Sequence, residues 1–130
     1  MLYVFPITIP ANTPQSAPTK TLLPLTAGTI THVMIQFPSG PVGLAHVFIR
    51  NGLNQVWPAN PEAYFTSDDE TIPWAEEYEM DTPPYQLQAY AWNTDDTYPH
   101  TITIRVELTP AAVEASLLDQ FKQLLGVGAA

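Results

Sequence analysis

The chain has 130 residues, of which 45% are hydrophobic, and its 13 acidic residues face only four basic ones. This length and composition fit one globular domain, and the absence of cysteine excludes a disulfide framework, a thiolate metal site and a cysteine nucleophile. The net charge of −9 repels phosphate backbones and anionic membranes, so we expect neither nucleic acid nor membrane as a partner.

The N-terminal segment alternates like a strand over residues 2–9, but Pro6 lacks the N–H that a central strand would use, so the segment suits an edge strand or an extended arm. Residues 10–18 (PANTPQSAP) follow as a polar, proline-rich linker. We therefore expect residues 1–18 to form an extended arm that reaches a neighbouring subunit by strand addition. The segment has no basic residue, which makes it a poor secretory leader.

Strand signals recur at short intervals up to residue 108, separated by glycine- and proline-containing turns. The last signal is the clearest, because Ile102, Ile104 and Val106 alternate with Thr103 and Arg105. The predicted strands are 19–25, 29–37, 44–50, 53–57, 85–92 and 101–108.

Within this region the sequence also predicts one hairpin turn and one segment of uncertain strand content. Asn51-Gly52 predicts a type I′ hairpin turn. Between residues 57 and 85 the signal is weaker, and one or two short strands are expected near 71–74 and 77–80. Seven or eight short strands predict an all-β domain, an antiparallel β-sandwich or jelly-roll-like fold over residues 19–108.

The periodicity changes after this domain, and residues 109–130 are expected to form an amphipathic helix with a short tail. Thr109 predicts the N-cap, Pro110 the first helical position and Gly126 the end of the helix. Because the two sheets would fill each other's inner faces, we expect the apolar stripe to pack against a partner or a second copy. The stripe consists of Val113, Leu117, Leu118, Phe121, Leu124 and Leu125.

Candidate catalytic residues are few. His32 and His46 lie in predicted neighbouring strands and His100 opens the last one, but no carboxylate within a few residues completes a metal site. Ser39 lacks the strand–turn–helix context of a nucleophile elbow. We therefore expect no catalytic residue, no metal ligand, no cofactor and no enzymatic activity.

The acidic residues gather between positions 62 and 81, where eight acids occur without a base. Such a run favours a solvated face, although a glycosidase-like carboxylate pair, or separately a metal-dependent hydrolase site, stays open. The loops 68–70 and 93–96 offer the oxygen ligands that Ca²⁺ prefers, but neither has the twelve-residue calcium-loop pattern. For 93–96, the favoured interpretation is a turn stabilised by Asx hydrogen bonds.

Aromatic residues are concentrated between positions 57 and 98. If Tyr90 and Trp92 lie on an outer face, they could stack on sugar rings; otherwise they belong to the core or to a protein interface. The aromatic and acidic region 57–98 therefore leaves a carbohydrate-binding or adhesion module as the alternative function.

Four segments carry a resemblance to small proteins of tailed phages and prophages: residues 7–14 (ITIPANTP), 33–49 (VMIQFPSGPVGLAHVFI), 56–69 (VWPANPEAYFTSDD) and 91–106 (AWNTDDTYPHTITIRV). The resemblance implies a virion component, such as a capsid decoration protein or a tail accessory. It includes no catalytic motif and transfers no functional residue.

These observations predict a non-enzymatic virion structural protein, acting as capsid decoration, cement or tail accessory and assembled in the host cytoplasm. The expected partners are further copies of the chain, as a homo-oligomer, and the major capsid protein or another virion protein. The expected interface residues are Leu2, Tyr3, Val4, Phe5, Ile7, Val113, Leu117, Leu118, Phe121 and Leu124.

Overall fold

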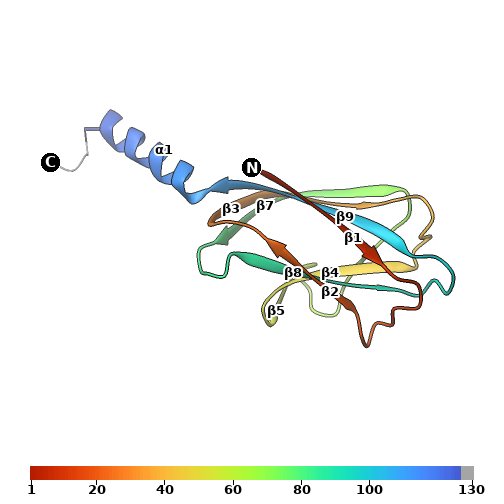
Figure 1. Ribbon diagram of the computed structural model, residues 1–130. Helices are drawn as coiled ribbons and strands as arrows, with labels where there is room; N and C mark the ends of the chain where they lie inside the picture. The colour runs from red at the N-terminus through yellow and green to blue at the C-terminus, as the bar shows by residue number, and fades with distance from the viewer. Residues whose placement is uncertain (127–130) are drawn as a thin grey trace.

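The computed structural model describes residues 1–126, with the backbone alone at positions 114 and 115, and shows two facing β-sheets from which a helix projects (Figure 1). The expected tail at 127–130 lies outside the described residues. The elements are β1 (Leu2–Ile9), β2 (Thr19–Pro24), β3 (Gly28–Phe37), β4 (Ala45–Asn51), β5 (Asn54–Trp57), β6 (Phe65–Thr66), β7 (Glu70–Met80), β8 (Gln86–Asn93), β9 (His100–Pro110) and α1 (Ala111–Leu124).

The strands pair from the two ends of the chain inward. β1 pairs with β9, β2 with β8, β3 with β7, and β4 with both β5 and β6, all antiparallel. The pairs β3–β9 and β4–β8 then join these strand pairs into two sheets, β1-β9-β3-β7 (sheet A) and β2-β8-β4-β5 (sheet B). One long hairpin rolled over into two facing sheets is a jelly roll. The predicted all-β sandwich is therefore confirmed.

The core lies between the sheets and follows the period of two that strands impose on their side chains. In β9, Ile102, Ile104 and Val106 are fully buried, whereas Thr101 and Glu107 are exposed. Inward-facing residues of the other strands complete one continuous core, which includes Ile7, Ile9, Leu23, Ile30, Val33, Ile35, Phe37, Val47, Ile49, Leu87 and Leu108.

The N-terminal segment is not the free arm that the sequence predicts. β1 is paired along its length with β9, and its inward-facing side chains Ile7 and Ile9 are buried in the core. In the expected linker, the backbone N–H of Asn12 donates to the carbonyl of Asp95, after β8, at 2.8 Å, and that of Thr13 donates to the carbonyl of Asn93, the last residue of β8, at 3.0 Å. β1 therefore belongs to the sandwich, because Ile7 and Ile9 complete its core, and the linker is tied to it at Asn12 and Thr13.

Pro6 fits this arrangement because β1 is an edge strand. Met1 and Leu108 exchange two backbone hydrogen bonds, of 2.6 Å and 2.7 Å. Bonding alternates along an antiparallel pair, so the odd residues of β1 bond to β9 and the even residues direct their N–H and C=O groups to the free edge. The missing N–H of Pro6 therefore costs no hydrogen bond of the sheet.

The weakly signalled region between β5 and β8 differs from its prediction. One eleven-residue strand, β7, replaces the two short strands, and it forms the second edge of sheet A. Its exposed Pro73, Glu77 and Glu79 interrupt that edge, as prolines and charged residues commonly do. The strand was hard to predict because its inward residues include the half-buried Glu76, which breaks the apolar alternation.

The hairpin between β4 and β5 also differs. Asn51 pairs with Asn54, so the loop residues are Gly52 and Leu53 rather than Asn51 and Gly52. Gly52 has a φ of 62°, whereas Leu53 has a negative φ. A type I′ turn needs positive φ at both central residues, so the predicted turn type is wrong.

The helix α1 follows β9 without a loop. Gly28 pairs with Pro110 in sheet A, which makes Pro110 the last strand residue and the N-cap, in place of the predicted Thr109. At the other end Gly126 has a φ of 71° and donates its N–H to the Gln123 carbonyl at 3.1 Å, so the predicted glycine terminus is confirmed. Figure 1 shows α1 leaving one end of the sandwich and pointing away from it.

The burial of β1 can be tested with two substitutions in this strand. We expect Ile9→Ala to lower the free energy of unfolding by about 2–5 kcal/mol, because it leaves a cavity at a fully buried position. Val4→Ala, at a side chain that is 52% exposed, should change it by at most about 0.5 kcal/mol. Chemical denaturation followed by tryptophan fluorescence measures both values. Equally small effects would mean that β1 is not part of the core.

Candidate functional site

The helix α1 carries a stripe of exposed apolar side chains. At 3.6 residues per turn its large apolar side chains fall within an arc of about 140°, and Asp119 and Gln123 lie on the opposite arc. The exposed fractions range from 46% at Val113 to 83% at Leu124. We define the apolar face of α1 as Val113, Leu117, Leu118, Phe121, Leu124 and Leu125, all of which are exposed. No helix within residues 1–126 has the length and apolar character needed to cross a membrane.

The predicted interface residues of β1 are divided between its two faces. Leu2 and Val4 are exposed on the outer face of sheet A. Tyr3 and Phe5 are half-buried and pack against the core, with their ring centroids 6.1 Å apart, and Ile7 is buried. Tyr3, Phe5 and Ile7 therefore stabilise their own domain, because successive side chains of a strand point to opposite faces.

The aromatic residues between 57 and 98 form two groups, the first of which packs on the core. The ring centroid of Trp74 lies 5.2 Å from that of Phe65 and 5.7 Å from that of Trp57, and Tyr78 lies 5.6 Å from Trp57. The indole N–H of Trp57 donates to Glu76 Oε1 at 2.8 Å. Trp57 is buried, so this group serves packing.

The second group lies on the outer face of sheet B, where a sandwich usually places polar side chains. His46 stands opposite Trp92 and Phe48 opposite Tyr90, with ring centroids 4.8 Å and 5.3 Å apart and both pairs within 9° of parallel. Tyr64, just before β6, meets the His46 and Trp92 rings edge-on at 5.0 Å each. We define these five residues as the aromatic face of sheet B.

Sequence reasoning found only part of this face. It singled out Tyr90 and Trp92 but not Phe48, and it treated His46 as a possible metal ligand or base. The signal was present in the segment LAHVFIR, because alternation places His46, Phe48 and Arg50 on one side of β4. That side faces outward, so aromatic residues there indicate an exposed or partly covered surface.

Arg50 extends the aromatic face. Its Cζ atom lies 5.0 Å from the ring centroid of Phe48 and 5.1 Å from that of Tyr90, within the range of a cation–π interaction. Its Nε atom is buried without a hydrogen-bond partner, and no carboxylate in the described part of the chain forms an ion pair with the guanidinium. Arg50 therefore packs on two aromatic rings and has no acidic partner among residues 1–126.

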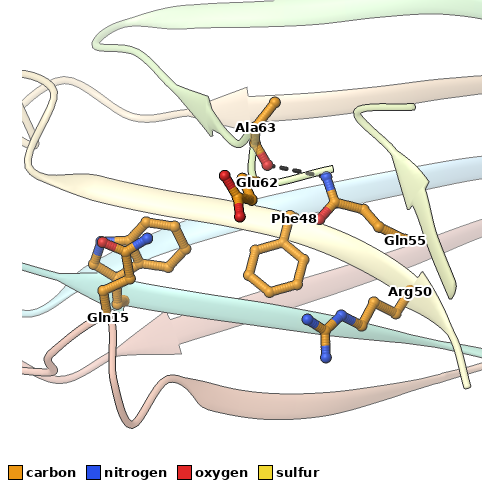
Figure 2. Close-up of a pocket in the computed structure, with 7 residues that line it drawn as sticks. Gln15, Phe48, Arg50, Gln55, Glu62 and Ala63 are labelled. Atoms are coloured by element: carbon orange, nitrogen blue, oxygen red, sulfur yellow. Dashed lines mark hydrogen bonds between the residues drawn. The ribbon is translucent and has the colours of Figure 1, made fainter. Parts of the chain in front are cut away.

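A pocket of about 520 Å³ opens on this face. Figure 2 shows the Phe48 ring at its centre, with Gln15, Glu62, Gln55 and Arg50 placed around the ring. The pocket therefore combines an apolar centre with a polar rim. Its principal lining residues are Gln15, Phe48, Arg50, Gln55, Glu62 and Trp92.

Gln55 fixes one wall of the pocket. Its Nε2 atom lies within hydrogen-bond distance of three carbonyl oxygens, those of Pro58 at 2.9 Å, Asn60 at 3.2 Å and Ala63 at 3.0 Å. One side-chain amide thus holds residues 58–63 beside β4. The wall that carries Glu62 is formed by the fold itself.

The three histidines are dispersed. His32 and His46 lie in different sheets, because the chain crosses from sheet A to sheet B between β3 and β4. His32 Nδ1 is 3.1 Å from the Glu107 carboxylate on an exposed surface. In the aromatic face, burial lowers the pKa of His46. Within the described residues, no three histidine or acidic side chains gather into a metal-binding group.

The acidic residues considered as calcium ligands accept hydrogen bonds from backbone N–H groups, those of the β3–β4 connection for Asp68 and those of its own loop for Asp95. Asp68 Oδ1 accepts hydrogen bonds from the N–H groups of Val42 and Gly40, both at 2.9 Å. Asp95 Oδ1 accepts one from the N–H of Thr97 at 2.9 Å. These bonds stabilise the ionised carboxylates and lower the pKa of both groups. The predicted Asx turn after β8 is therefore confirmed.

No model of a known protein family matches the sequence, and no curated protein is significantly similar to it.

The Asp95 turn generates a pH-dependent prediction. The N–H of Thr97 and the buried His100, whose Nε2 is 2.8 Å from Asp95 Oδ2, lower the pKa of Asp95 in the folded state. A lowered carboxyl pKa contributes stability above about pH 4, and this contribution is lost as the pH falls through the folded-state pKa. We expect Asp95→Asn to be less stable than the wild type at pH 7 and to lose less stability between pH 5 and pH 2, as measured by thermal unfolding. Parallel pH profiles for the two proteins would contradict this role.

Proposed function

We propose that this protein is a non-enzymatic structural component that self-associates through α1, and that the assembly attaches to a protein lattice such as a capsid or tail. One observation carries the proposal. The apolar face of α1 is exposed along the described helix, which points away from its own sandwich (Figure 1). A helix in this position is available to a second copy of the chain.

The energetics favour association. A fourteen-residue helix is marginal in water and needs packing to be stable. Each large apolar side chain that becomes buried contributes roughly 1.5–3 kcal/mol, and α1 exposes five of them, with a sixth at its C-cap, Leu125. The sandwich holds the helix at its start, where the Ala111 N–H donates to the Ala27 carbonyl at 2.9 Å. A neighbouring apolar helix would supply the missing burial.

A second copy of α1 suits this surface because of charge. Two chains with a net charge of −9 each repel one another when their bodies approach. Because α1 projects beyond the sandwich, contact between helices brings the chains together while the acidic bodies stay apart. By sequence α1 carries two acids, Glu114 and Asp119, and one base, Lys122, so it adds little of the like charge that the bodies carry.

The virion setting rests on the resemblance to tailed-phage and prophage proteins. The jelly roll is compatible with it, since viral capsid proteins use this architecture, but lectin domains use it as well. Fold alone therefore does not select the function. Mass spectrometry of purified particles from the phage or prophage that encodes the chain tests this setting, and absence of the protein from the particles would contradict it.

Self-association is tested by Leu117→Ser combined with Phe121→Ser. We expect the double variant to dissociate to a single chain, because it removes two central side chains of the apolar face, each worth roughly 1.5–3 kcal/mol when buried. Light scattering measures the mass, and circular dichroism checks that the β signal is unchanged. Asp119→Ser with Gln123→Ser, on the opposite arc, is the matched control and should keep the oligomer. A wild-type protein that is monomeric at high concentration would sink the proposal.

A further inference from the structure

We propose that the pocket on the aromatic face of sheet B binds a neutral saccharide. This inference is independent of α1, which continues from sheet A. It rests on the composition, rigidity and charge of the pocket, which together match the chemistry of a sugar ring more closely than that of an ion or a lipid chain.

The distribution of polar and apolar groups is the first argument. A pyranose ring has an apolar face of C–H groups and a periphery of hydroxyl groups. Figure 2 shows the complementary pattern, in which the Phe48 ring occupies the centre and the side chains of Gln15, Gln55, Glu62 and Arg50 surround it. An apolar surface with a few convergent polar groups is typical of small-molecule sites, and about 520 Å³ lies within their usual size range.

The hydrogen-bonding groups of the rim are the second argument. A sugar hydroxyl both donates and accepts, so its site needs groups of both kinds. Arg50 supplies donors only, Glu62 supplies acceptors, and the Gln15 amide supplies both. No side-chain hydrogen bond of Arg50 occurs among the described residues, so its guanidinium retains donors for a ligand.

The charge of the pocket indicates a neutral ligand. Arg50 and Glu62 contribute one positive and one negative charge to the lining. An acidic ligand would approach a chain of net charge −9 and meet Glu62, and a cationic ligand would meet Arg50. A neutral polyol avoids both repulsions and can bond to both side chains.

The site is also preformed, which lowers the entropic cost of binding. The Phe48 and Tyr90 rings lie nearly parallel with their centroids 5.3 Å apart, and Arg50 Cζ packs against both rings at 5.0 Å and 5.1 Å. The loop that carries Glu62 is fixed by the three contacts of Gln55. A ligand would therefore find the central ring and one wall already ordered.

The experiment is an NMR titration of the full chain with glucose, galactose, mannose and N-acetylglucosamine, with glucuronic acid and glucosamine as charged probes. We expect at least one neutral sugar to bind, with chemical-shift changes confined to the pocket. Phe48→Ala and Glu62→Gln should each weaken that binding about tenfold or more, since each removes a principal contact. Because Glu62 is exposed, Glu62→Gln tests the site even if Phe48→Ala does not fold.

Two controls separate this inference from other effects. Glu77→Gln removes an exposed carboxylate on β7, in the other sheet, and should bind like the wild type. The Leu117→Ser and Phe121→Ser double variant should also bind with wild-type affinity, so failure of self-association leaves this test intact. Absence of binding by all four neutral sugars, binding of a charged probe alone, or unchanged affinity in Glu62→Gln would overturn the inference.

Discussion

The pairing of the first strand with the last determines where the other parts of this protein lie. Because β1 and β9 are neighbours, the N-terminus and the start of α1 meet at one end of sheet A, where the Met1 amino group bonds to the Leu108 carbonyl at 2.6 Å. β9 also pairs with β3 on its other side. The helix therefore starts from a strand held along both edges, and its direction is set by the sheet rather than by a flexible loop.

The two outer faces of the sandwich have different chemistry, although the side chains of neither face have to pack into the core. Across β1 and β9 the outer face of sheet A presents Thr8 and Thr101, whose hydroxyl oxygens are 3.0 Å apart. The corresponding positions of β4 and β8 present Phe48 and Tyr90. An aromatic outer face can serve as a small second core when a loop covers it. Here the loop at 58–63 lines a pocket at Phe48 and does not fill it. This favours a binding role over packing alone.

The sequence predicts those features that depend on a local period. The alternation around Ile104 places β9 and its buried face, and the spacing of Leu117, Phe121 and Leu124 places the helix and its apolar face. Pro6 predicted either an edge strand or an extended arm, and the structure has the edge strand, because a proline shows that a strand lies at an edge but not which sheet supplies that edge. The answer came from a partner about a hundred residues away in the sequence.

The pocket was the least predictable feature for the same physical reason. Its lining joins Gln15 from the loop after β1, Phe48 and Arg50 from β4, and Glu62 from the loop after β5. No local pattern links these positions, and only the β4–β8 pairing brings Phe48 beside Tyr90. By contrast, the outward direction of Phe48 could have been derived from the alternation of β4 alone.

The two proposed surfaces have a physical consequence when they occur in one molecule. A site that contacts one sugar ring gives low affinity by itself. Self-association through α1 would leave the outer face of sheet B uncovered, because the helix projects from the end of the sandwich (Figure 1). Several pockets on one assembly would then meet a surface that carries repeated glycans, and linked sites bind more tightly than single ones when their spacing permits simultaneous contact. The helix would thus raise the effective affinity of a pocket that it does not touch.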